Sequence, residues 1–112
     1  MNNYEQRLLN SLPSCIEKDA RVTQVDSKQM AIVTLNDGHQ LLYSYFTCIA
    51  FRPRFVDTWV LDATKYSSTT SKQVSQFRRD KDCITEPRED FIDELAQLLG
   101  VTSNQADYIA SR

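Results

Sequence analysis

Few side chains in this chain of 112 residues have the type and spacing that catalysis requires. His39 is the one histidine, and it follows the turn-forming sequence at 36–38, where we expect it to face solvent. A single exposed histidine with no neighbouring nucleophile motif is weak support for acid–base or metal chemistry. Glu89 and Asp93 lie four residues apart on an expected helix, but the helix dipole alone favours acidic side chains in a first turn. We therefore expect no catalytic residues, no metal ion, no cofactor and no enzymatic activity.

The cysteines and glycines argue against two further kinds of site. Cys15, Cys48 and Cys83 are each separated by more than thirty residues and form no C-x-x-C pair, so neither a zinc site nor a disulfide framework is indicated. We expect them to behave as small apolar side chains. Two glycines, one in a turn and one after a helix, cannot build a glycine-rich phosphate-binding loop.

Charge is distributed unevenly along the chain. Residues 52–81 carry seven basic and three acidic side chains, whereas residues 82–112 carry two basic and seven acidic ones. Two interpretations stay open, because the segments could form a bipolar surface that steers a partner or could pair with each other after folding. Under the first interpretation, the basic segment supplies the side chains expected to contact a partner, namely Arg52, Arg54, Lys65, Lys72, Arg78 and Arg79.

A run of hydroxyl side chains stands at the start of an expected helix within this basic segment. Helix N-termini bind anions through free backbone amides, so the run is a candidate anion site. The alternative is an ordinary helix cap with a polar turn. The residues of the candidate anion site are Ser68, Thr69, Thr70 and Ser71.

The last twenty-one residues have the pattern of a helix–turn–helix pair. Gly100 suits the turn between two helices, and Thr102 has the spacing of a capping residue for the second. The second helix would present Asn104 and Gln105 to a DNA groove, with Arg112 close by. The preceding helix is strongly acidic, however, and nucleic-acid affinity depends on basic contacts to phosphate. A helical hairpin that closes the core is the other interpretation.

The elements that must position these side chains follow from hydrophobic spacing and turn residues. Hydrophobic residues make up 41% of the chain and occur along its whole length, which predicts one domain over residues 1–112. The expected fold is α+β, with an N-terminal helix, an antiparallel sheet of four or five strands, and three C-terminal helices. The ranges are 3–12 for the first helix, 21–62 for the strands, and about 70–80, 87–99 and 102–110 for the last helices.

Two stretches of the middle segment resemble a known family. Residues 42–50 follow an L-x-S-Y-x-T-x-I-A pattern, and residues 65–77 follow K-Y-S-x-T-T-S-K with a phenylalanine at position 77. Over residues 30–80 the chain is therefore similar to small uncharacterised domains of bacteriophages and other mobile elements. The resemblance implies an origin in a bacteriophage or another mobile element, but it implies no mechanism of action. Gln73 stands where the pattern has histidine, which argues against a metal or catalytic role there.

Together these observations predict a non-enzymatic protein that binds a macromolecule. By analogy with small phage proteins, the resemblance implies contact with a host or phage protein, such as anti-CRISPR-like inhibition of a host defence system. The alternative is a nucleic-acid-binding or regulatory protein that uses the C-terminal helix pair and the basic segment. Neither a signal-peptide pattern nor a hydrophobic stretch of membrane-spanning length occurs in the sequence, so we expect the protein in the bacterial cytoplasm.

Overall fold

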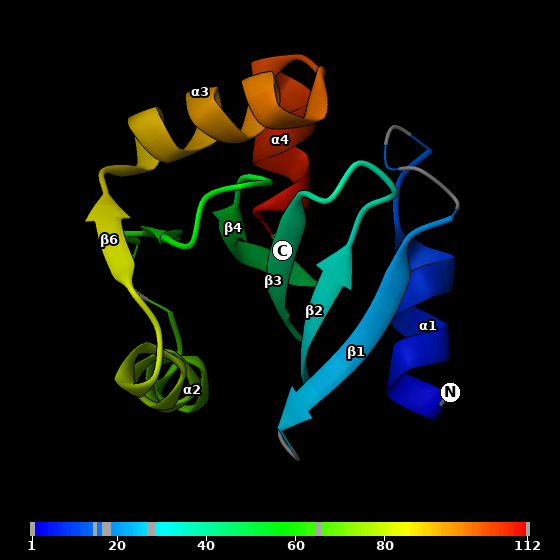
Figure 1. The fold of residues 1–112 in the computed structure, drawn as a ribbon. Coiled ribbons are helices and arrows are strands. Elements are labelled where there is room, and N and C mark those ends of the chain that lie inside the picture. Colours follow the sequence, from blue (N-terminus) through cyan, green and yellow to red (C-terminus); the bar gives the residue numbers. More distant parts are fainter. Residues whose placement is uncertain (1, 15, 17–18, 27–28, 65, 112) are drawn as a thin grey trace.

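The computed structural model describes residues 2–14, 16, 19–26, 29–64 and 66–111, which form a six-stranded sheet with helices on both faces (Figure 1). None of the helices in these ranges is long and apolar enough to span a membrane. In chain order, the elements are α1 (Asn3–Ser11), β1 (Arg21–Asp26), β2 (Met30–Thr34), β3 (Gln40–Ser44), β4 (Thr47–Arg52), β5 (Trp59–Asp62), α2 (Ser68–Arg79), β6 (Cys83–Glu86), α3 (Arg88–Leu99) and α4 (Ser103–Ile109).

The strands lie in the sheet in their order along the chain, but the last connection differs from the others. β1 to β5 pair antiparallel with their neighbours, whereas β6 pairs parallel to β5 because α2 crosses over between them. The α+β class is confirmed, but the expectation of a purely antiparallel sheet with four or five strands is wrong. β6 interrupts the expected series of three C-terminal helices. Its four residues are too few, and their flanks too charged, to show a strand pattern.

Each face of the sheet has its own hydrophobic core. The central strands β2, β3 and β4 are buried on both sides, which agrees with the apolar character of Met30–Leu35 on both strand faces. On one face α1, α3 and α4 cover a core that includes Leu8, Phe91 and Leu95. On the other face α2 covers a smaller core, to which it contributes Phe77 and the sheet contributes Met30, Leu42, Ile49, Ala50, Trp59 and Leu61.

α3 and α4 form the expected helix pair, but α2 does not join them. Gly100 ends α3 in the left-handed conformation, with φ of 68°, and Thr102 caps α4 through a capping box. α4 buries Ala106 and Ile109 in the larger core, on the sheet face opposite α2. α2 therefore lies on the other face of the sheet and does not extend this pair to a three-helix unit (Figure 1).

A buried ion pair joins the end of β5 to α3. The Asp62 side chain is fully buried, and its carboxylate accepts hydrogen bonds from Thr64, Tyr66 and the Arg88 guanidinium. Burial alone would raise the pKa of Asp62, but these hydrogen bonds outweigh burial and hold its pKa below the ordinary value. Arg88 also donates to the Ala110 carbonyl at 3.0 Å, so one side chain ties the sheet, α3 and the end of α4 together.

Removal of the Arg88 guanidinium would leave the Asp62 carboxylate buried and short of its charged partner. We predict that Arg88→Ala lowers the free energy of unfolding in urea by about 3 kcal/mol, which is the loss typical when one partner of a buried ion pair is removed. Arg21→Ala, on an exposed position of β1, is the matched control and should change stability by less than about 0.5 kcal/mol. Equal stability of the two variants would contradict a structural role for the pair.

Candidate functional site

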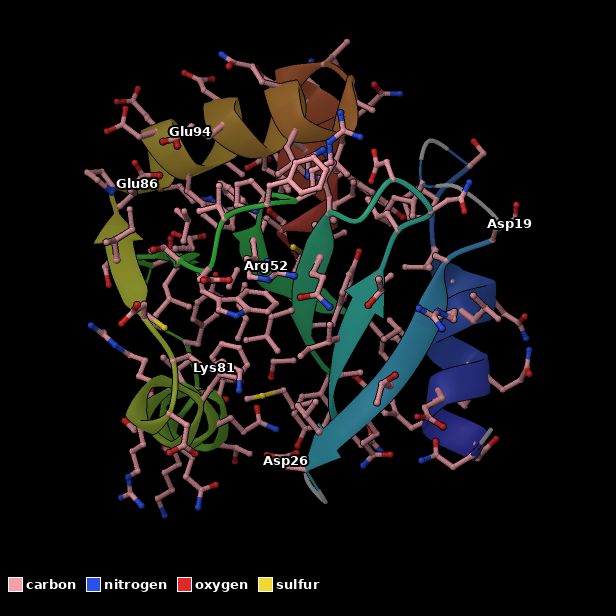
Figure 2. All side chains as sticks on the ribbon, viewed as in Figure 1. Asp19, Asp26, Arg52, Lys81, Glu86 and Glu94 are labelled. Carbon is pink, nitrogen blue, oxygen red and sulfur yellow. The ribbon has the colours of Figure 1, made fainter. Side chains whose placement is uncertain are left out.

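An open groove lies on the α2 side of the sheet, where α2 ends and leaves part of the face uncovered. It encloses about 640 Å³, and Figure 2 shows Arg52 and Lys81 on the face that bears it. Its floor comes from β2 to β5 and its wall from the end of α2 and the turn that follows. The residues that line this groove are Ile32, Gln40, Arg52, Asp57, Trp59, Arg79, Asp80, Lys81 and Asp82.

The loop at 53–58, between β4 and β5, borders the groove and carries the most exposed large hydrophobic residue among those described. The Phe55 side chain is 94% exposed, and its backbone has φ of 66°. Val56 beside it is also exposed. A bulky residue with positive φ is a conformational outlier, and neighbouring structure must hold it in place. We call residues 53–58 the tip loop.

Arg52, the last residue of β4, holds the tip loop. Arg52 donates through Nη1 to the Val56 carbonyl at 2.6 Å and through Nε to Gln40 Oε1 at 2.8 Å. The Arg54 guanidinium carbon lies 5.6 Å from the centre of the Phe55 ring, within cation–π distance. The loop therefore presents an aromatic ring beside a guanidinium in one defined geometry.

The turn between β2 and β3 supports the same loop. The backbone N–H of Arg54 donates to His39 Nδ1 at 3.0 Å. Gly38 has φ of 97°, and a Cβ at this position would come within 3.3 Å of Arg54 Cβ, so the close approach favours glycine. The expectation that His39 simply faces solvent is wrong, because the side chain is half-buried and accepts this hydrogen bond.

The charge imbalance of the sequence survives folding. Both carboxylate–guanidinium pairs among the described residues use Arg88, which contacts Asp62 and Asp107. Asp62 is an acidic residue of the basic segment, and Arg88 is a basic residue of the acidic segment, so their pairing removes one minority charge from each segment. No ion pair of the described part of the chain involves the other basic side chains on this side, Arg52, Arg54, Lys72, Arg78, Arg79 and Lys81.

The structure places the predicted basic residues at four locations. Arg52 and Arg79 line the groove, and Arg54 lies in the tip loop. Lys72 is exposed on α2 and lines a neighbouring shallow hollow together with Arg79. Arg78 turns toward β6, where its Nη1 donates to Thr85 Oγ1 at 3.4 Å. Lys65 lies outside the described residues.

The run of hydroxyl residues divides between solvent and core. Ser68, Thr69 and Ser71 are exposed in the first turn of α2. Thr70 is buried, however, and its hydroxyl contacts Ser44 Oγ at 3.0 Å, so it does not face an external anion. Gln73 is buried in the same polar cluster, where its Oε1 accepts from Ser44 at 2.7 Å. The helix cap is Ser67, whose Oγ accepts the Thr70 backbone N–H, so Thr70 alone of the run is turned inward.

The residues proposed for DNA contact are arranged poorly for that role. Asn104 is exposed on α4, but the Gln105 side chain accepts the backbone N–H of Thr102 at 3.0 Å and so completes the capping box. α4 is seven residues long, and the acidic start of α3 precedes it. Arg112 lies outside the described residues.

The structure brings together one carboxyl pair that the sequence pattern did not indicate. Glu86 at the end of β6 contacts Glu94 of α3, and Figure 2 labels both. The hydrogen bond with Glu94, burial, and the charges of Glu94 and Asp90 raise the pKa of Glu86 to about 7. A proton shared between the two carboxyl groups removes one negative charge, and this allows them to lie side by side. No group of three or more potential metal ligands forms among the described residues, so the pair has no third ligand there.

The raised pKa of Glu86 predicts a pH dependence of stability. Between about pH 4.5 and 7 the native state binds the proton that the unfolded state has released, so stability falls as the pH rises through this interval. Glu86→Gln should raise the unfolding temperature at pH 8 and flatten the decline. Glu89→Gln, at an exposed position of α3, should keep the wild-type profile. A wild-type unfolding temperature that does not change from pH 5 to 8 would contradict this assignment.

Sequence reasoning missed the hydrophobic part of the site. Phe55 and Val56 follow Arg52-Pro53-Arg54, and an aromatic residue next to a β-branched one usually indicates a strand interior. The available signal is the proline and the two arginines around a phenylalanine, which are typical of an exposed loop. Lys81 also lines the groove, and its Nζ lies 4.8 Å from the centre of the Phe77 ring.

Comparison with known protein families assigns the chain to a family. A family of unknown function, DUF8033, matches residues 16–94, which is more than half of the chain. The chain belongs to this family. The matched range includes every residue of the groove, the whole tip loop and β6, so the candidate site lies within the part of the chain that defines family membership. No curated protein and no solved structure matches the chain.

Proposed function

We propose that the chain is a non-enzymatic binding protein that docks on a partner protein through the tip loop and the groove beside it. The observation that carries this function is Phe55, an almost fully exposed aromatic residue with positive φ. A left-handed backbone costs an L-residue about 1–2 kcal/mol, and such strain concentrates at functional sites. In the isolated chain the exposed ring provides no compensating burial.

The chemistry of this surface favours a protein partner. Aromatic and arginine side chains dominate the binding energy of protein interfaces, and Phe55 and Arg54 stand side by side here. The groove contributes three basic and three acidic side chains, a balance that suits the mixed charges of a protein surface better than the phosphates of nucleic acid. The complementary partner has an apolar pocket for Phe55 and carboxylates beside it for Arg54 and Arg79.

The biological setting we propose follows the resemblance to phage and mobile-element domains. A domain of this size that covers a surface of a host protein acts as an inhibitor, and a component of a host defence system is the partner class that this setting favours. The protein would then work in the cytoplasm of a bacterial host by occupancy alone, as anti-CRISPR-like inhibitors do. Such a role needs a binding surface and no catalytic groups.

Replacement of Phe55 tests this function. Phe55→Gly removes the ring and relieves the backbone strain, so it should leave the unfolding temperature unchanged or higher. Loss of an interface anchor typically costs about 2 kcal/mol or more, which predicts that affinity for the partner falls about 30-fold or more. Tyr108→Ala is the matched control, because Tyr108 is a second exposed aromatic residue that does not line the groove.

The measurement has two stages. Tagged wild-type protein, Phe55→Gly and Tyr108→Ala are each used to capture proteins from lysate of the natural host, and the partner retained by wild type and Tyr108→Ala is then titrated by calorimetry. Capture of the same partner by all three proteins with equal affinity would reject the tip loop as the binding site.

A titration against nucleic acid tests the alternative function. Wild-type protein is added to labelled duplex DNA, single-stranded DNA and RNA at low and high salt. We expect no specific binding. Tight binding that weakens steeply with salt, and that Asn104→Ala reduces while Phe55→Gly does not, would replace the proposed function with nucleic-acid recognition by the C-terminal helix pair.

A further inference from the structure

β6 forms one edge of the sheet, and its backbone geometry shows which groups are free to pair. The Trp59 N–H donates to the Asp82 carbonyl at 2.8 Å, and the Ala63 N–H donates to the Glu86 carbonyl at 2.9 Å, so both carbonyls face β5. Alternate residues of a strand direct their backbone groups to opposite edges. The N–H and C=O groups of Cys83 and Thr85 therefore point away from β5, and no strand of the described ranges lies on that side.

The opposite edge of the sheet is protected, which makes the open edge at β6 distinctive. On β1, the backbone N–H of Gln24 donates to the Glu5 carboxylate of α1 at 2.8 Å, and the pairing with β2 is interrupted between Gln24 and Asp26. Capping by a side chain and an irregular register are devices that prevent edge-to-edge association. The described part of the chain provides no comparable cover for β6.

A large apolar side chain lies at the centre of the open edge. Ile84 is 49% exposed, although it sits between Cys83 and Thr85 in a strand of four residues. Thr85 contacts Arg78 on the α2 side, and Cys83 packs against the same core, so the alternation of the strand places Ile84 on the α3 side. An incoming strand at this edge would cover the exposed part of Ile84.

The edge strand also marks the point where the charge of the chain changes sign. The basic segment ends at Lys81 and the acidic segment begins at Asp82, directly before β6. Arg78, Arg79 and Lys81 therefore lie near one end of the strand, and the acidic start of α3 follows the other end. If the β6 strand of a second molecule paired antiparallel with this one, the basic side chains before each β6 would lie beside the acidic start of α3 in the other molecule.

We propose that this edge pairs with β6 of a second copy of the chain, antiparallel across a two-fold axis at Ile84. In that register, Cys83 of each copy lies opposite Thr85 of the other, and the free backbone groups of both residues are satisfied. The two Ile84 side chains meet at the axis as a non-hydrogen-bonded pair, with Cα atoms about 4.5 Å apart. The interface is isologous and closes as a dimer, because each sheet then ends at its protected β1 edge. It is separate from the tip loop.

Sedimentation velocity over a concentration series tests the pairing with two matched pairs of variants. Wild type should shift from monomer to dimer as its concentration rises. Ile84→Lys places like charges at the axis and should weaken the dimer by about tenfold or more, whereas Val25→Lys, on the exposed face of β1, should not. Thr85→Pro removes one outward N–H and should also give monomer, whereas Thr85→Ala keeps that N–H and should dimerise.

A cross-link tests the register directly. In a Cys83→Ser background, Ile84→Cys should form an intermolecular disulfide on mild oxidation, because the expected Cα separation lies in the range that disulfides span. Val25→Cys in the same background should stay unlinked. Phe55→Gly should dimerise like wild type, so the experiments can reject the dimer without rejecting the tip loop as a binding site, and the reverse. Wild type that stays monomeric at every concentration, or equal behaviour of the Ile84 and Val25 variants, would overturn the dimer; a strand of another protein would then be the remaining occupant.

Discussion

The contact between the buried Asp62 carboxylate and Arg88 sets the arrangement of the rest of the structure. A buried charge needs a partner of opposite sign, and Arg88 can reach Asp62 only when α3 begins beside the end of β5. That position places β6 parallel to β5 and lets Arg88 reach Asp107 and the Ala110 carbonyl of the C-terminal segment. The same pair also neutralises one minority charge of each charged segment, and no ion pair among the described residues joins α3 to the basic side chains of the groove.

The groove and the tip loop follow from the way the sheet is covered. Within the described ranges, three helices cover one face and α2 alone covers the other, and α2 ends before it reaches all of β2 to β5. The uncovered part becomes the groove, and the loop at 53–58 rises at its border because Arg52 and His39 fix its backbone. The binding surface therefore results from unequal helix packing on the two faces of the sheet. The charged side chains line the region that α2 leaves uncovered.

Much of this architecture is predictable from local patterns, and the remainder depends on contacts between distant residues. The hairpin turn at 36–38 and the caps at Gly100 and Thr102 indicate their elements correctly, because each is a short-range constraint. β6 could not be predicted, since four residues show no period and their strand conformation depends on the Trp59–Asp62 partner. Phe55 was missed for the converse reason: its residue type indicates a core position, and only the Arg52 and Arg54 contacts place it outside.

Whether Asp62 and Arg88 act as one unit can be measured with a double-mutant cycle on the free energy of unfolding. Wild type, Asp62→Asn, Arg88→Met and the double variant are unfolded in urea, and the coupling is the difference between the double loss and the sum of the single losses. A coupling of about 2 kcal/mol or more is expected for two groups in one buried network. Additive losses, within about 0.5 kcal/mol, would show that the two side chains stabilise the protein independently and that their pairing does not organise the fold.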